Sequence, residues 1–433
     1  MPITSPATAH IQDLGTYVSA SPSSFHAVHQ AGRRLGDAGF VRLDELEPWD
    51  AGAGRFFIIR DGALIAWVVP EGAGPTTGFN ILGAHTDSPS FKLKPKPTTG
   101  AHGWLQAGVE IYGGPLLNSW LDRELQLAGR LVMLDGTEHL AATGPLLRFP
   151  QLAIHLDRAV NDGLTLDKQR HMNPVWGLGN PADFDVLKVL AGAVPDASVD
   201  PAQIGGYDVV IADTQPPAVF GGSGEFFASG RLDNLSSTHA GLVALIAHAS
   251  SAPAGSPIAV LAAFDHEEIG SNSRSGACGP ILEDVLVRVS DGLGASAGQR
   301  RQAVAASFCI SADAGHAVHP NYAERHDPAN HPVLNGGPLL KINANQRYAT
   351  DAHGAAAWAR LCGEAGVPYQ EFVSNNAIPC GSTIGPLTAT RLGIRTLDVG
   401  VPLLSMHSAR ELCGVEDPWR LAAVTELFYR TAL

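Results

Sequence analysis

The sequence of 433 residues is poor in cysteine and in basic residues, and it has no long apolar run. Its five cysteines are scattered and odd in number, which favours reduced thiols over a disulfide framework. The net charge of -13 argues against a nucleic-acid partner, because phosphate binding needs a basic surface. Nowhere do about 18 apolar residues follow one another, so we expect no membrane partner either.

Low-complexity tracts, blocks of like charge and repeats at a fixed period are also missing. The first residues, Met1 to Pro6, lack the basic segment followed by an apolar one that marks a secretion signal, so we expect a cytoplasmic protein. A hydrophobic content of 45% is ample for a core, and the length predicts about two or three domains.

The chain does contain five short patches of residues that commonly bind metal ions. In chain order they are His85-Thr86-Asp87, Asp233, Asp265-His266-Glu267-Glu268, Asp313 and His407. A structural zinc site usually takes Cys and His in tight local pairs, and a single catalytic zinc usually has three protein ligands. Here the ligands are widely dispersed, and two glutamates are adjacent. This inventory predicts two divalent ions bridged by a carboxylate, with a spare glutamate to move protons.

Four of the patches follow short apolar runs, which are typical of parallel strands buried on both faces. The runs are residues 79–84, 258–264, 307–312 and 394–399. Asp233 instead opens an amphipathic stretch, 234–248, which predicts a helix N-terminus facing the same crevice. Ligands of such sheets gather beyond the carboxyl ends of the strands. The pattern therefore predicts an α/β fold with a doubly wound, mostly parallel sheet.

The long separation between His85 and Asp233 predicts an inserted domain, because the ligands of one site must lie close in space. Residues 105–133 alternate in polarity, and Gly113-Gly114-Pro115 divides two strand-like runs, as in antiparallel structure. Pro216-Pro217 and the glycines that follow mark the return of the chain. We expect residues 1–92 and 231–433 to form one catalytic domain, interrupted at 93–230 by a β-rich dimerisation domain.

Each of these signals also has an ordinary structural explanation. Any one of the 17 histidines is more often exposed or satisfied in the core than a metal ligand. Glu267-Glu268 alone would more often be a solvated pair, and the HExxH zinc motif is absent because position 270 is Gly. Buried strands, however, seldom end in four ionisable residues that have no use. Asp87, two residues after His85, matches a carboxylate that orients a ligating imidazole.

Longer stretches of the chain resemble the aspartyl aminopeptidase family of two-metal metallopeptidases, from about residue 20 to the C-terminus. Every metal position expected from that family holds a competent ligand. The stretches that carry the resemblance are Gly83–Pro89, Leu152–Leu156, Arg231–Leu235, Asp265–Ser271, His316–Tyr322, Asn345–Tyr348 and Met406–Ser408.

The resemblance implies two divalent ions per chain, zinc first of all, with manganese or cobalt as other candidates. The implied ligands are Asp233 as the bridge, His85 and Asp313 on one ion, and Glu268 and His407 on the other. Ions of this type lower the pKa of bound water toward about 7, which makes hydroxide available for attack on a peptide carbonyl. Glu267 is then the general base, which takes the proton and passes it to the leaving amine.

The resemblance also implies a substrate and a partner. Lys341 resembles a lysine that pairs with N-terminal Asp or Glu, although a Lys on the outer face of an edge strand is a common alternative. Tyr348 and His319 would belong to the same substrate site. His155 resembles a residue that reaches the active site of a neighbouring subunit in a tetrahedral dodecamer. A strand histidine satisfied within its own domain is the alternative.

We therefore expect an aminopeptidase that removes acidic residues from peptides with a free N-terminus. One alternative is an aminopeptidase of neutral or broad specificity, and another is a different two-metal amidohydrolase, such as a deacylase or a carboxypeptidase. A non-catalytic assembly protein is the third alternative. A complete ligand set with a free Glu267 argues against the last one.

Overall fold

The computed structural model describes residues 5–49, 52–195 and 197–433. Within these residues the largest sheet has nine strands, and its central strands β13, β4, β14 and β18 are parallel. The mostly parallel α/β sheet expected from the sequence is thereby confirmed. In sheet order the strands are β1 (Val41–Arg42), β2 (Gly54–Arg60), β3 (Ala63–Val69), β13 (Ile258–Phe264), β4 (Phe79–His85), β14 (Phe308–Ala312), β18 (Arg395–Gly400), β16 (Leu339–Ile342) and β17 (Gln370–Val373).

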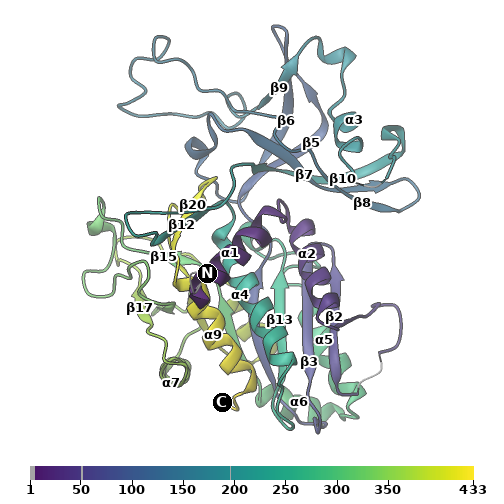
Figure 1. Cartoon of the computed structure of the whole chain (residues 1–433), viewed down its shortest axis with the longest axis vertical. Coiled ribbons are helices and arrows are strands. Elements are labelled where there is room, and N and C mark those ends of the chain that lie inside the picture. Colours follow the sequence, from purple (N-terminus) through teal and green to yellow (C-terminus); the bar gives the residue numbers. More distant parts are fainter. Residues whose placement is uncertain (1–4, 50–51, 196) are drawn as a thin grey trace.

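Helices cover both faces of this sheet (Figure 1). One face packs against α1 (Pro6–Ser19), α2 (Ser24–Asp37), α4 (Leu232–Ala249), α7 (Ala352–Ala365) and α9 (Asp417–Arg430). The other face packs against α5 (Ile281–Gly292), α6 (Ala297–Ala305) and α8 (Ile384–Leu392). Successive residues of β13 point to opposite faces, so Leu261 joins one core and Val260 the other. This double burial is why the run 258–264 is apolar throughout.

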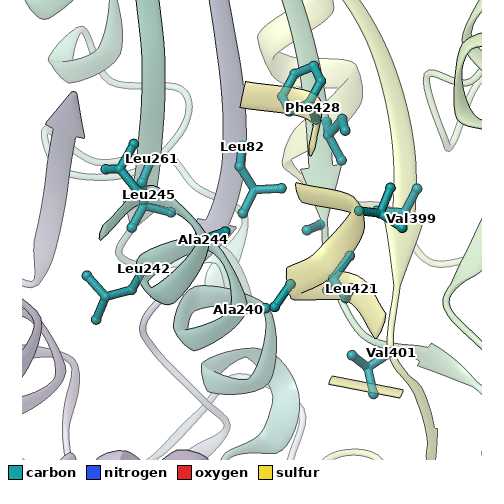
Figure 2. Packing of buried hydrophobic residues seen from close by; sticks show 14 of the residues in the cluster. Leu82, Ala240, Leu242, Ala244, Leu245, Leu261, Val399, Val401, Leu421 and Phe428 are labelled. Carbon is teal, nitrogen blue, oxygen red and sulfur yellow. The ribbon is translucent and has the colours of Figure 1, made fainter. Parts of the chain in front are cut away.

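Helix α4 lies directly on strands β4 and β13. In Figure 2, Ala244 and Leu245 of α4 lie beside Leu82 and Leu261 of the strands, and Ala240 lies beside Leu421 of α9. A Cβ atom on Gly241 would come within 2.8 Å of Leu261 Cδ1 and closer still to Leu82 Cδ2. The absence of a side chain at this position lets the helix approach the sheet. The approach places Asp233, in the first turn of α4, beside His85 at the end of β4.

A second sheet, of six antiparallel strands in the described residues, lies beyond one end of the first (Figure 1). In order its strands are β8 (Glu138–Ala142), β7 (Leu125–Met133), β10 (Ile204–Asp213), β5 (Ser90–Thr99), β6 (Trp104–Tyr112) and β9 (Val175–Leu178). Helix α3 (Val186–Ala191) packs on this sheet. The two runs flanking Gly113-Gly114-Pro115 form strands as predicted, but β6 and β7 are not neighbours. The segment between them is therefore not a hairpin turn.

A third sheet joins the end of the predicted insertion to later segments of the chain. In the described residues its strands are β11 (Ala218–Phe220), β12 (Phe226–Ser229), β20 (Glu411–Gly414), β19 (Pro402–Leu404) and β15 (Gly315–His316). Strand β5 of the inserted sheet begins at Ser90, and β11 and β12 pair outside that sheet. The domain boundaries at 92/93 and 230/231 stay a prediction. No helix among the described residues is long and apolar enough to cross a membrane.

Candidate active site

Three of the predicted site patches begin at the ends of strands in the large sheet. His85 is the last residue of β4, Asp265 follows β13, and Asp313 follows β14. His407 lies in the loop between β19 and β20. Because β4, β13 and β14 are parallel, their carboxyl ends meet at one edge of the sheet. Asp233 reaches the same edge from the first turn of α4.

Two histidines approach Asp233 from opposite sides. His85 Nε2 lies 3.3 Å from Asp233 Oδ1 and 3.4 Å from Asp313 Oδ1. His407 Nε2 lies 3.6 Å from Asp233 Oδ2 and 3.4 Å from Glu268 Oε2. Asp233 thus belongs to two groups of three possible ligands, and the ligand atoms of each group lie within 4.8 Å of one another. Glu267 Oε2 lies 3.9 Å from His85 Nε2, and Glu267 forms a third such group with His85 and Glu268.

These residues fit divalent cations. Asp233 Oδ1 and Glu268 Oε1 are buried, and neither has a hydrogen-bond partner among the described residues. A buried carboxylate oxygen without a partner is costly unless a cation neutralises it. Imidazole nitrogen and carboxylate oxygen are ligands that zinc accepts, and manganese or cobalt tolerates the same mixture.

Crowding of negative charge gives the same indication. Burial raises the pKa of Glu267, and the nearby Asp313 and Asp233 raise it further, against the influence of His85. Burial and then Asp233 raise the pKa of Glu268 well above its usual value. Cations among these carboxylates would relieve the repulsion, because each ion attracts the charged form of every neighbour.

Asp87 contacts the imidazole of His85 and the loop of the two glutamates. His85 Nδ1 lies 3.1 Å from the backbone carbonyl oxygen of Asp87 and 3.4 Å from its Oδ1. With its proton on Nδ1, His85 presents a free Nε2 to a cation. The Asp87 carboxylate accepts the backbone N–H groups of Glu267, at 3.0 Å, and Glu268, at 3.2 Å. It thereby fixes the loop that carries both glutamates.

The inserted region contacts the site through residues 112–116. The Tyr112 hydroxyl donates to Asp87 Oδ2 at 2.8 Å, and His407 Nδ1 lies 3.0 Å from the Gly114 carbonyl oxygen. Gly113 has a φ of +68°, and a Cβ there would lie 3.2 Å from Glu268 Cβ. The glycines therefore let the insertion pass close to two predicted ligands.

Sequence reasoning missed Tyr112 and Glu411. Glu411 accepts the backbone N–H groups of Asp233 and His407. Its signal in the sequence was a carboxylate four residues after a predicted ligand. Tyr112 had no comparable signal, because its partner Asp87 lies on a different element.

Two of the three predicted substrate residues lie at a neighbouring cavity of about 280 Å³. Tyr348 and His319 line this cavity, together with Phe372 and Met406. Lys341 is only 2% exposed, donates to the Ala314 carbonyl oxygen at 2.7 Å and lies 5.3 Å from the centre of the Tyr348 ring. The ammonium group therefore lies behind the Tyr348 side of the cavity wall. Because β16 pairs with strands on both sides, the edge-strand explanation of this lysine is wrong.

His155 is not part of the cluster formed by its own chain. It lies in a turn at residues 154–156 of the inserted region, and it is exposed. Within the described residues its side chain forms no hydrogen bond or ion pair. The same stretch of chain also exposes Leu152, Ile154 and Leu156.

A doubly wound sheet whose strand ends gather histidines and carboxylates around a shared aspartate defines a metal-dependent hydrolase. Comparison with known proteins then identifies the family. The family model described as "Aminopeptidase I zinc metalloprotease (M18)" matches residues 17–429, and the chain belongs to that family. The predicted enzyme class, a metalloaminopeptidase, is thereby confirmed.

Individual relatives match over nearly their whole length. A Streptomyces coelicolor protein named "Probable M18 family aminopeptidase 2" is 54% identical over 416 residues, which cover 95% of this chain and 96% of the relative. The cryo-EM structure of the Ape4 and Nbr1 complex has a TM-score of 0.95 at 36% identity and covers 99% of this chain and 87% of that one. The structure of the S. cerevesiae mApe1 dodecamer has a TM-score of 0.83 at 27% identity, with 97% and 96% covered.

Proposed function

We propose that this chain is a two-metal aminopeptidase that removes aspartate and glutamate from the N-termini of peptides. The observation that carries the two-metal part is the double membership of Asp233, which belongs to one ligand group with His85 and to another with His407. One carboxylate with an oxygen toward each group is the arrangement of a bridging ligand. The family to which the chain belongs supports zinc as the metal.

In this proposal His85 and Asp313 would complete the coordination of one ion, and Glu268 and His407 would complete the coordination of the other. When bound, such ions lower the pKa of a coordinated water and polarise the scissile carbonyl. The Asp87 carbonyl and the Gly114 carbonyl keep the two imidazoles in the tautomer that binds metal.

Glu267 is the general base of the proposed reaction. It shares its loop with Glu268, yet only Glu268 belongs to the group around His407. We assign to the Glu267 carboxylate the proton of the attacking water and its delivery to the leaving amine. The hydrogen bond from its backbone N–H to Asp87 holds the Glu267 loop in place.

Lys341 supports the proposed specificity for N-terminal aspartate and glutamate. A buried ammonium group with one carbonyl partner can stabilise a carboxylate placed near it. One observation favours a second candidate, an aminopeptidase for neutral residues. The cavity wall includes the apolar side chains of Phe372 and Met406, and Lys341 does not itself line it.

We further propose that His155 acts in the site of a neighbouring subunit of a tetrahedral dodecamer. The exposed apolar residues around it support burial against another chain. The mApe1 relative, which is a dodecamer, supports the assembly. A His155→Phe chain mixed with a Glu267→Gln chain should then recover part of the activity, because some sites combine an intact Glu267 with an intact neighbouring His155. Proven subunit exchange without recovery contradicts the role.

The proposed function is tested by hydrolysis of a panel of N-terminal amino-acid amides, with and without a chelator. We expect the Asp and Glu amides to be cleaved fastest and the chelator to abolish all cleavage. Faster cleavage of Leu amides would favour the second candidate.

We also propose a cytoplasmic location, which the five free cysteines support.

A further inference from the structure

We propose that Glu411 is a positioning residue that sets the spacing between Asp233 and His407. This inference rests on the proposed function, in which both residues are metal ligands. Glu411 is 1% exposed, and its two carboxylate oxygens are used by two different partners. Oε2 accepts the backbone N–H of Asp233 at 2.9 Å, and Oε1 accepts the backbone N–H of His407 at 2.7 Å.

The strand pairing explains why this residue can reach both ligands. Glu411 begins β20, the middle strand between β12 and β19 in the third sheet. In the register of β12 and β20, Glu411 lies opposite Ser229, a few residues before Asp233. On its other side β20 pairs with β19, after which the chain continues to His407. Glu411 thus lies where the two segments that lead to the ligands come together.

The backbone at both ligands needs this support. His407 has a φ of +64°, a left-handed conformation that is uncommon for a residue with a side chain. Asp233 is 4% exposed, so its N–H cannot rely on water and must find an acceptor within the protein. The two oxygens of Glu411 let one side chain accept both N–H groups. Replacing it would loosen two ligands at once.

Glu411 contacts the site through the backbone of two predicted ligands, so it acts by orienting them. Residues that orient ligands in this way typically contribute about 10- to 100-fold in metal affinity.

The test compares Glu411→Gln with a matched control, Asp417→Asn. Asp417 is fully buried, and its carboxylate also accepts two backbone N–H groups, those of Asn335 at 2.6 Å and Gly337 at 2.9 Å. It therefore has the same kind of hydrogen bonding without contact to a predicted ligand. Zinc affinity is measured by competition with a chelator, and the thermal midpoint is measured with and without zinc.

We expect Glu411→Gln to weaken zinc binding by about 10- to 100-fold and to shrink the rise in thermal midpoint on adding zinc. Asp417→Asn should lower the thermal midpoint of the metal-free protein. It should leave unchanged both the zinc affinity and the rise in thermal midpoint on adding zinc. Glu411→Gln could instead lower the thermal midpoint equally with and without zinc and keep wild-type zinc affinity. That result would show a purely structural role and overturn the inference.

A second variant covers the case in which Glu411→Gln does not fold. Glu411→Asp keeps both carboxylate oxygens but shortens their reach, so we expect intermediate zinc affinity. Wild-type affinity in that variant would also overturn the inference. A wild-type protein that binds no zinc would refute the proposed function instead, so the two failures are distinguishable.

Discussion

The nine-stranded sheet and the six-stranded sheet contribute to the candidate site in different ways. The large sheet carries His85, Asp313 and the adjacent glutamates at the ends of its strands. The inserted sheet carries none of the residues in the ligand groups of the described chain, but its Tyr112 and the Gly114 carbonyl hold Asp87 and His407 in place. The large sheet thus supplies candidate reacting groups, and the inserted region supplies some of the groups that orient them.

The sharpest test of the part played by the large sheet is Glu267→Gln. Loss of a general base typically costs about 100- to 10,000-fold in rate, so we expect kcat to fall by that factor. Metal content should stay near that of the wild type, because Glu267 is not a proposed ligand. Rate measurements together with elemental analysis check both expectations.

The neighbouring glutamate provides the matched control. Glu268→Gln should reduce metal content, since Glu268 lies 3.4 Å from His407 Nε2 in one of the ligand groups. If Glu267→Gln turns over at a near-normal rate, or if the two variants lose metal equally, the division between base and ligand is wrong.

Lys341 tests whether the large sheet also sets specificity. Truncating one partner of a buried charge pair costs about 2 kcal/mol or more, which corresponds to about 30-fold. Lys341→Met keeps most of the side-chain length, and it should lower kcat/KM for N-terminal Asp and Glu by at least about 30-fold. Activity on N-terminal Leu should change far less. Equal losses on acidic and neutral substrates would show that Lys341 supports the fold alone.

The residues of the candidate ligand groups were predictable because buried parallel strands and their polar ends leave a local pattern. The runs before His85 and Asp313 are apolar on both faces, so a charged residue at their ends is conspicuous. The burial of Lys341 was predictable for the same reason, but its position behind Tyr348 was not. That position depends on the packing of side chains from separate elements.

The support of the site was not predictable, because it depends on backbone atoms and on strand order. The Gly114 carbonyl is a backbone group, so no side chain in the sequence indicates its role. The sequence of β6 or β7 alone does not predict that other strands lie between them in the sheet. Glu411 is partly an exception, since it lies close to His407 in sequence. His155 needs a second chain, which the fold of one chain cannot supply.

The part played by the inserted sheet is tested by Tyr112→Phe, which removes one hydroxyl and the hydrogen bond to Asp87. We expect a loss of about 10-fold in zinc affinity or kcat/KM, well below the effect of Glu267→Gln. Tyr207→Phe is the matched control, because its hydroxyl donates at 2.7 Å to the Lys94 carbonyl in the same sheet. It should leave both quantities unchanged. A loss as large as that of Glu267→Gln would break the distinction between the two sheets.

The helices over the large sheet carry buried histidines that are remote from the predicted ligands. These histidines should affect the stability of the fold and leave the reaction unchanged. Burial lowers the pKa of His10 from 6.5 to about 3, and the nearby His239 lowers it further, although Asp13 opposes the change. The fold therefore favours neutral His10, whereas the unfolded chain protonates it near pH 6.5. Stability from this group is complete above that pH and is lost as the pH falls toward the folded pKa.

Between pH 7 and pH 6 one such histidine lowers the free energy of unfolding by about 0.7 kcal/mol, which is the smallest effect predicted here. Denaturant unfolding of wild type and His10→Gln at the two pH values should show a smaller pH dependence in the variant. Their difference cancels the contribution of the metal ligands, which both proteins share. The exposed His102 offers a control, since His102→Gln should retain the wild-type dependence. An unchanged dependence in His10→Gln would mean that His10 is not held neutral by the fold. A large change in kcat would show that this helical layer also acts on the reacting groups.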